Sequence, residues 1–118
     1  MIKISFENIG FEEGIYFIKN ENNISLTVIG HSNFDEKGKD IVCSAVSVLS
    51  QTLLLSISKI CSIDQAIKNE SGLLNTVFSI SNLTEDQLKS LKNIFDFYII
   101  GIFELVKAYP DYIDLDLK

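Results

Sequence analysis

The first third of the chain alternates apolar and polar residues, as a strand does when one face of its sheet is buried. The alternation runs through residues 2–7 and returns at 24–28, where each stretch carries a large apolar residue at every second position. A further apolar run occupies residues 15–18, and the Asn-Glu-Asn-Asn of 20–23 has the composition of a turn. These segments predict an antiparallel meander with one buried face.

The periodicity changes to that of a helix after Gly38-Lys39-Asp40. Asp40 is a suitable N-cap, because its carboxylate accepts hydrogen bonds from the free amides of a first turn. At 100° per residue, the large apolar side chains that follow share one stripe. They are Val42, Val46, Leu49, Leu53, Ile57 and Ile60. The pattern predicts a helix that starts at Asp40, ends near Cys61 and buries this stripe.

A second hairpin and a long helix complete the pattern. Two candidate strands, 65–68 and 73–80, flank the turn-forming Asn-Glu-Ser-Gly of 69–72. A capping box of Thr84 and Gln87 then begins the second helix. Pro110 stops that helix, because proline disfavours helix at the residue before it.

The order of strands, helix, strands and helix predicts one α+β domain over residues 1–118. Its architecture is a two-layer ββαββα core, in which both helices pack on one face of an antiparallel sheet. The apolar run at 15–18 makes an extra N-terminal strand possible. The acidic residues after the second helix, Asp111, Asp114 and Asp116, are expected to form a solvated tail.

Composition narrows the classes of function. The 118 residues include 10 Lys, no Arg and 16 acidic residues, for a net charge of −6. This balance argues against a direct nucleic-acid partner, which needs a basic face. One His and two Cys are too few for a four-ligand structural zinc site, and no metal site is expected. A straight helix would hold Cys43 and Cys61 about 27 Å apart, so they are not expected to form a disulfide.

We expect neither an export signal nor a membrane span in this sequence. Its first residues alternate and include Lys3 and Glu7, which is unlike a signal peptide. Ile41 to Ser58 contains no charge and is long enough to cross a bilayer. Its many Ser, Thr and Gln side chains nevertheless favour a buried helix of a globular protein. We therefore expect a cytoplasmic location and no membrane partner.

Three ionisable residues attract attention by position, namely His31, Asp40 and Cys43. If Asp40 is the N-cap, Cys43 lies in the first turn, where the helix dipole favours a thiolate and free amides can bind an oxyanion. Cys43 lies on the shoulder of the apolar stripe, with Ser47 one turn further on. His31 ends a strand, and the polar loop of 32–39 can return it to Cys43 as a general base.

Other interpretations of the same residues remain open. Most cytosolic cysteines are small buried apolar residues. His31 can be a loop residue, and Asp40 can be a cap with no chemistry. Ser47 can serve packing alone, and Cys61 is expected to be structural.

The segment around these residues resembles a known signature. Gly30-His31-Ser32, followed by Gly38-Lys39-Asp40-Ile41-Val42-Cys43-Ser44-Ala45-Val46-Ser47-Val48-Leu49, is similar to the motif of the ribosomal-processing cysteine proteases, called Prp. The polar segment between His and Cys, Gly72-Leu73, the long second helix and the closing 109–113 segment agree with it. The resemblance covers essentially the whole chain.

The resemblance implies a specific activity and site. Prp proteases remove a short N-terminal extension from a large-subunit ribosomal protein, and they are usually homodimers. It implies His31 and Cys43 as the catalytic dyad, with Gly30, Asp40 and Ser47 in support. The chain departs from the family in having Ser32 and Ser44 where Ala is usual. It also departs by inserting roughly ten residues around 11–20.

The resulting hypothesis is a cysteine endopeptidase with no cofactor. Cys43 attacks as a thiolate, His31 moves the proton, and amides at the helix start bind the oxyanion. The loop over the substrate includes Ser32, Asn33, Phe34 and Gly38. A short basic, aromatic-containing segment would complement the acidic chain. Two alternatives remain, a non-catalytic ribosome-associated binding module and a thiol hydrolase with another substrate.

Overall fold

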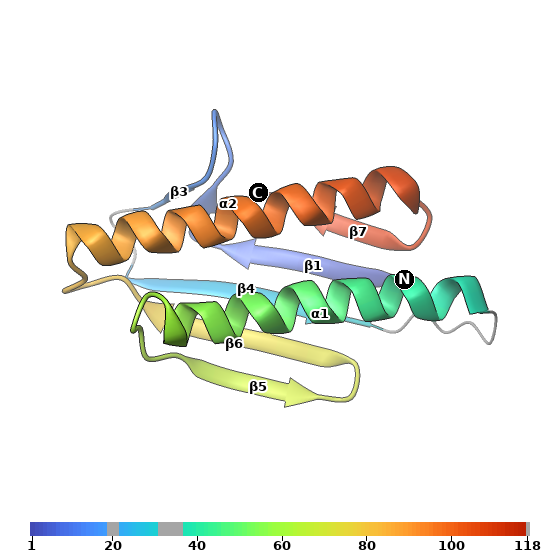
Figure 1. The fold of residues 1–118 in the computed structure, drawn as a ribbon, viewed down its shortest axis with the longest axis horizontal. Coiled ribbons are helices and arrows are strands. Elements are labelled where there is room, and N and C mark those ends of the chain that lie inside the picture. The colour runs from blue at the N-terminus through green and yellow to red at the C-terminus, as the bar shows by residue number, and fades with distance from the viewer. Residues whose placement is uncertain (19–21, 31–36, 118) are drawn as a thin grey trace.

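Two helices cover one face of a five-stranded sheet in the computed structural model (Figure 1). It describes residues 1–18, 22–30 and 37–117, and only the backbone of 37–40. The elements in chain order are β1 Ile2–Glu7, β2 Ile9–Gly10, β3 Tyr16–Phe17, β4 Asn23–Ile29, α1 Lys37–Lys59, β5 Ala66–Glu70, β6 Leu73–Ser79, α2 Glu85–Ala108 and β7 Ile113–Asp116.

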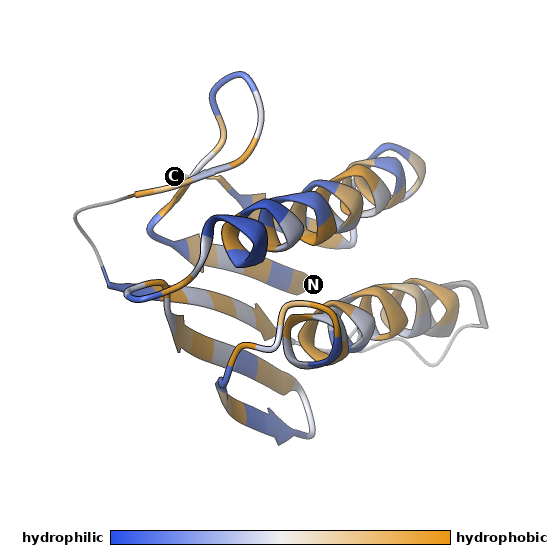
Figure 2. Ribbon diagram, turned by 60° about the vertical axis from the view of Figure 1, so that its left-hand side comes forward, coloured by the Kyte–Doolittle hydropathy of each residue, from blue (hydrophilic) through white to orange (hydrophobic). Residues whose placement is uncertain are grey.

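The sheet has the strand order β5-β6-β4-β1-β7. All its pairings are antiparallel except that of β1 with β7, which is parallel. The view along the helices shows both of them on the same side of the sheet (Figure 2). The predicted two-layer α+β class is therefore confirmed, with a mixed sheet that is antiparallel for most of its width.

The acidic end of the chain is a strand, so the prediction of a tail was wrong, although Asp111 and Asp114 are exposed to solvent as expected. β7 pairs with β1 from Ile2 opposite Ile113 to Ser5 opposite Asp116. The N–H of Ile2 also donates to the carbonyl of Tyr112 over 2.9 Å. Without β7 the backbone groups on this edge of β1 would have no strand partner, and Ile113 would lose its buried position.

The predicted meander is also corrected. β1 pairs directly with β4, from Lys3 opposite Ile29 to Glu7 opposite Ser25, so no extra strand lies between them. The inserted residues form a separate hairpin of β2 and β3. Its apolar side chains pack on the core instead, with the ring centroids of Phe17 and Phe95 5.7 Å apart.

α2 follows its sequence signals. The N–H of Gln87 donates to Oγ1 of Thr84 over 3.0 Å, and the N–H of Thr84 donates to Oε1 of Gln87 over 2.9 Å. This is the predicted capping box, and the helix ends at Ala108, shortly before Pro110.

α1 begins earlier than predicted. It starts at Lys37, so Asp40 lies inside the first turn and is not the N-cap. Lys37-Gly38-Lys39 contains no residue that forbids helix, and an acidic residue is favourable anywhere in a first turn. Most of the predicted stripe is buried, but Ile60 is 62% exposed because the helix has already ended at Lys59.

A buried hydrogen bond joins the two helices. Oγ of Ser50 and the hydroxyl oxygen of Tyr98 are 2.8 Å apart, and the two residues are 0% and 1% exposed. Burial raises the pKa of Tyr98 above its usual value. The two hydroxyls satisfy each other where solvent cannot reach either of them.

Tyr98→Phe should therefore destabilise the protein by about 1–3 kcal/mol, because it leaves the hydroxyl of Ser50 without its partner. Ser50→Ala removes the other partner, and the double variant should lose less than the sum of the single changes. Urea unfolding measures all three free energies, and strict additivity would contradict the coupling.

The raised pKa gives a second readout of the same pair. In the unfolded chain Tyr98 ionises near pH 10, whereas the folded protein holds it neutral. The contribution of neutral Tyr98 to the free energy of unfolding is therefore complete below about pH 10 and declines at higher pH. Above about pH 10, the unfolding free energy of Tyr98→Phe should therefore decrease less with pH than that of the wild type.

Candidate active site

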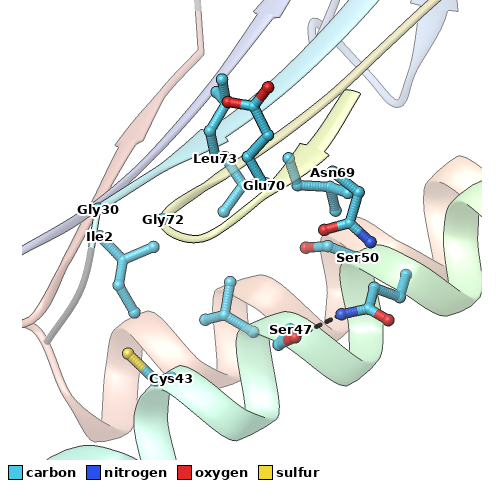
Figure 3. A pocket seen from close by; sticks show the side chains of 13 residues that line it. Ile2, Gly30, Cys43, Ser47, Ser50, Asn69, Glu70, Gly72 and Leu73 are labelled. Atoms are coloured by element: carbon cyan, nitrogen blue, oxygen red, sulfur yellow. Dashed lines mark hydrogen bonds between the residues drawn. The ribbon is translucent and has the colours of Figure 1, made fainter. Parts of the chain in front are cut away.

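Cys43 lines a cavity of about 210 Å³ between α1 and the sheet (Figure 3). The other walls come from Ile2 on β1, the end of β4 at Gly30, and the β5–β6 turn around Gly72. Cys43 is half-buried and faces this cavity, so it is not part of the closed core. This placement agrees with its predicted position on the shoulder of the helix.

Ser47 and Gln51 continue the Cys43 side of α1 along the cavity. They follow Cys43 by one and two helical turns and both line the same space. Nε2 of Gln51 donates to Oγ of Ser47 over 2.8 Å (Figure 3). The structure therefore brings the predicted pair of Cys43 and Ser47 together, and it adds Gln51, which the sequence interpretation did not include.

The opposite wall carries a second residue that the sequence analysis missed. Asn69 lines the cavity, and its side chain extends from β5 toward α1 (Figure 3). Gln51 was detectable by its helical spacing from Cys43. Asn69 had no such signal, because only the pairing of β5 with β6 brings it near α1.

Gln65 ties that wall to the helix. Its Nε2 donates to Oγ of Ser58 over 2.8 Å, and Oγ1 of buried Thr76 donates to its Oε1 over 2.7 Å. One amide thus bridges α1 and β6 at the start of β5. These bonds hold the start of β5 against the C-terminal half of α1.

Gly30 is required by close backbone approach. Its φ is +113°, and a Cβ there would collide with the carbonyl oxygen of Met1. Its N–H donates to the carbonyl of Gly72 over 2.9 Å, which joins the end of β4 to the β5–β6 turn. Gly30 itself lines the cavity of Cys43.

Several predicted site residues cannot be placed. His31, Ser32, Asn33 and Phe34 lie outside the described residues. Gly38 and Asp40 are in the first turn of α1, where the backbone alone is described. The His31–Cys43 dyad and the substrate loop therefore stay predictions.

The position of Cys43 corrects the expected oxyanion site. The unpaired amides of a helix belong to its first four residues, here 37–40. Cys43 comes later, in the second turn, where backbone amides are bonded inside the helix. The helix start is consequently not beside the sulfur in the way that an N-cap at Asp40 would have required.

Cys61 has the structural environment predicted for it. It is 2% exposed, and burial raises the pKa of its thiol. Its carbonyl accepts a hydrogen bond from Nε2 of Gln87 over 3.1 Å. Within the described ranges, no group of three His, Cys, Asp or Glu could hold a metal ion.

Comparison with known families decides the classification. The model of the family described as cysteine protease Prp matches residues 13–114. The chain belongs to the Prp cysteine protease family. No curated protein matches the chain.

Solved structures show that the Prp fold is shared. A Streptococcus mutans protein is 23% identical with a TM-score of 0.65, and the match covers 98% of this chain and 92% of that one. The S. aureus ribosomal processing protease Prp, in complex with a substrate peptide, is 17% identical with a TM-score of 0.69 over 100% of both chains. Its complex with a covalently linked product peptide gives 18% identity and a TM-score of 0.67, again over 100% of both chains.

Gly30→Ala should destabilise this Prp fold by more than the strain of a positive φ, which is about 1–2 kcal/mol. The matched control is Gly14→Ala, because Gly14 has a φ of +107° and open space where the Cβ would go. The difference between their unfolding free energies measures the collision with Met1. Equal losses would show that the close approach has no energetic consequence.

Proposed function

We propose that the chain is a cysteine endopeptidase that removes the short N-terminal extension of a large-subunit ribosomal protein during ribosome assembly. Membership of the Prp family supports the reaction class. The observation that carries the proposal is that the cysteine of the motif lines an open cavity next to Gly30, which precedes the only histidine.

Cys43 and His31 form the proposed catalytic dyad. His31 takes the proton of the thiol, and Sγ of Cys43 forms a bond to the scissile carbonyl carbon. The tetrahedral intermediate then expels the amine, which receives the proton from His31. Water hydrolyses the remaining thioester and regenerates the thiol. Asp40 and Ser47 hold this arrangement in place.

The proposed substrate is a short basic segment. A chain of net charge −6 attracts such a peptide and speeds its association. Ser32, Asn33, Phe34 and Gly38 form the loop that closes over the peptide. The reaction needs only water besides the peptide, so we propose no metal or cofactor. Because bacterial ribosomes assemble in the cytoplasm, we propose a cytoplasmic location.

A synthetic peptide of the extension and its junction should be cut once by the wild type, with cleavage read by mass spectrometry. Cys43→Ala and His31→Ala should abolish the cut, because each removes one member of the dyad. Cys61→Ala is the matched control, since the other thiol is buried in the core, and it should still cleave.

The same assay separates the alternatives. Binding of the peptide without cleavage by the wild type would favour a binding module. No binding and no cleavage would favour a thiol hydrolase acting elsewhere. Cleavage by Cys43→Ala would contradict the proposed nucleophile.

We also propose that the protein is a homodimer that associates through its helices. Large apolar side chains of the helix layer are exposed to solvent, and both helices lie on the same face of the sheet (Figure 2). This helix-layer patch consists of Ile41, Val48, Leu55, Ile60, Phe97 and Ile100, of which Phe97 is 73% exposed. A standard interface buries about 800 Å² per partner.

The way in which α1 is buried favours a protein partner for this patch. Residues 41–59 of α1 are long and apolar enough to span a membrane by length and composition. However, Val42, Val46, Leu53 and Ile57 bury one side of the helix against the core. Only the outer side of α1 remains exposed. In a symmetric dimer this apolar side can pack against the same side of α1 in a second copy.

Phe97→Lys should convert the dimer to a monomer, because a lysine ammonium would be buried without a partner at the centre of the interface. Light scattering after size-exclusion chromatography gives the mass directly. Ile67→Lys is the control, since Ile67 is 51% exposed on edge strand β5 and does not belong to the helix-layer patch. A monomeric wild type, or recruitment to lipid vesicles through this face, would contradict the dimer.

A further inference from the structure

The hydrogen bond from Gln51 to Ser47 leaves the serine hydrogen available. Nε2 of Gln51 donates over 2.8 Å, so Oγ of Ser47 is the acceptor. A hydroxyl has one hydrogen and two lone pairs. The serine can therefore still donate one hydrogen bond, and its side chain lines the cavity of Cys43.

A helical serine often donates to the carbonyl four residues earlier, which here belongs to Cys43. Among the residues that the structure describes, the side chain of Ser47 hydrogen-bonds with Gln51 alone. Its hydrogen is consequently not consumed by the helix. The direction of the amide determines this outcome, because an acceptor at the position of Nε2 would attract the hydroxyl hydrogen toward residue 51.

The proposed reaction needs a hydrogen-bond donor close to Cys43. When a thiolate adds to a carbonyl, the π electrons move to oxygen, and the oxyanion must be stabilised by preorganised donors. The free amides at the start of α1 precede Cys43 by most of a turn or more. Ser47 lies one turn after Cys43 on the side of the helix that faces the cavity.

We propose that Gln51 is a positioning residue, which donates to Oγ of Ser47 and thereby aims the serine hydroxyl at the oxyanion formed on attack by Cys43. The inference rests on the proposed peptidase function. No proton is transferred in this step. The hydroxyl donates a hydrogen bond to the oxyanion until the carbonyl re-forms and the amine leaves.

Substitutions at residue 51 test the direction of the bond. Gln51→Glu replaces the donor by an acceptor, so the hydroxyl of Ser47 should turn toward the carboxylate. Gln51→Lys keeps a donor and should keep the serine correctly oriented. Thr52→Ala is the matched control, because Thr52 lines a different groove, shared with Phe97.

Single-turnover cleavage of the extension peptide separates kcat from KM in these variants. Ser47→Ala should lower kcat about 100-fold, in the range for loss of one oxyanion donor. Gln51→Glu should lower kcat to a similar degree without raising KM, while Gln51→Lys and Thr52→Ala should stay near wild type. In the Ser47→Ala background, Gln51→Glu should have no further effect, and thermal unfolding should confirm that every variant is folded.

The outcomes distinguish the two levels of the proposal. Equal kcat values for Gln51→Glu and wild type would overturn the positioning role and leave the peptidase intact. A kcat loss of equal size in Gln51→Lys would also overturn it, because the direction of donation would then be irrelevant. A wild type that does not cleave the peptide would overturn the peptidase function and the positioning role with it.

Discussion

The rotation of α1 about its own axis controls most of what the molecule presents. Burial of Val42, Val46, Leu53 and Ile57 fixes this rotation, because turning the helix would return their side chains to water. Successive residues are 100° apart, so the orientation of every other side chain follows. Cys43 then faces the cavity, while the outer side of the helix carries no charge between residues 41 and 58. One packing constraint therefore determines both the site and the apolar outer face.

The ends of three strands meet where this helix brings its cysteine. The carbonyl of Met1 approaches Gly30 so closely that no side chain fits there, and Gly30 in turn bonds Gly72. Pairing of β7 with β1 secures the strand that Met1 precedes. The acidic end of the chain thus contributes to the site indirectly, by completing the sheet edge behind it.

The two cysteines lie in different environments. Cys61 lies in the core, where burial disfavours its thiolate. Cys43 lines a cavity with hydroxyl and amide side chains around it. A thiolate nucleophile needs access to its substrate and polar neighbours that stabilise charge. Of the two, only Cys43 has both, and it is also the cysteine of the family motif.

The sequence by itself determined the elements whose signals are local. Periodicity located both helices and most strands, the Thr84–Gln87 box and Pro110 bounded α2, and the motif around Gly30 and Cys43 indicated the family. Tertiary structure decided the rest, because it depends on which segments meet. Strand β7 needed the free edge of β1, and the inserted hairpin needed a core surface on which to pack. Local sequence signals likewise could not predict where α1 starts or that Asn69 lies near α1. Neither cap strength nor strand propensity carries information about contacts distant in sequence.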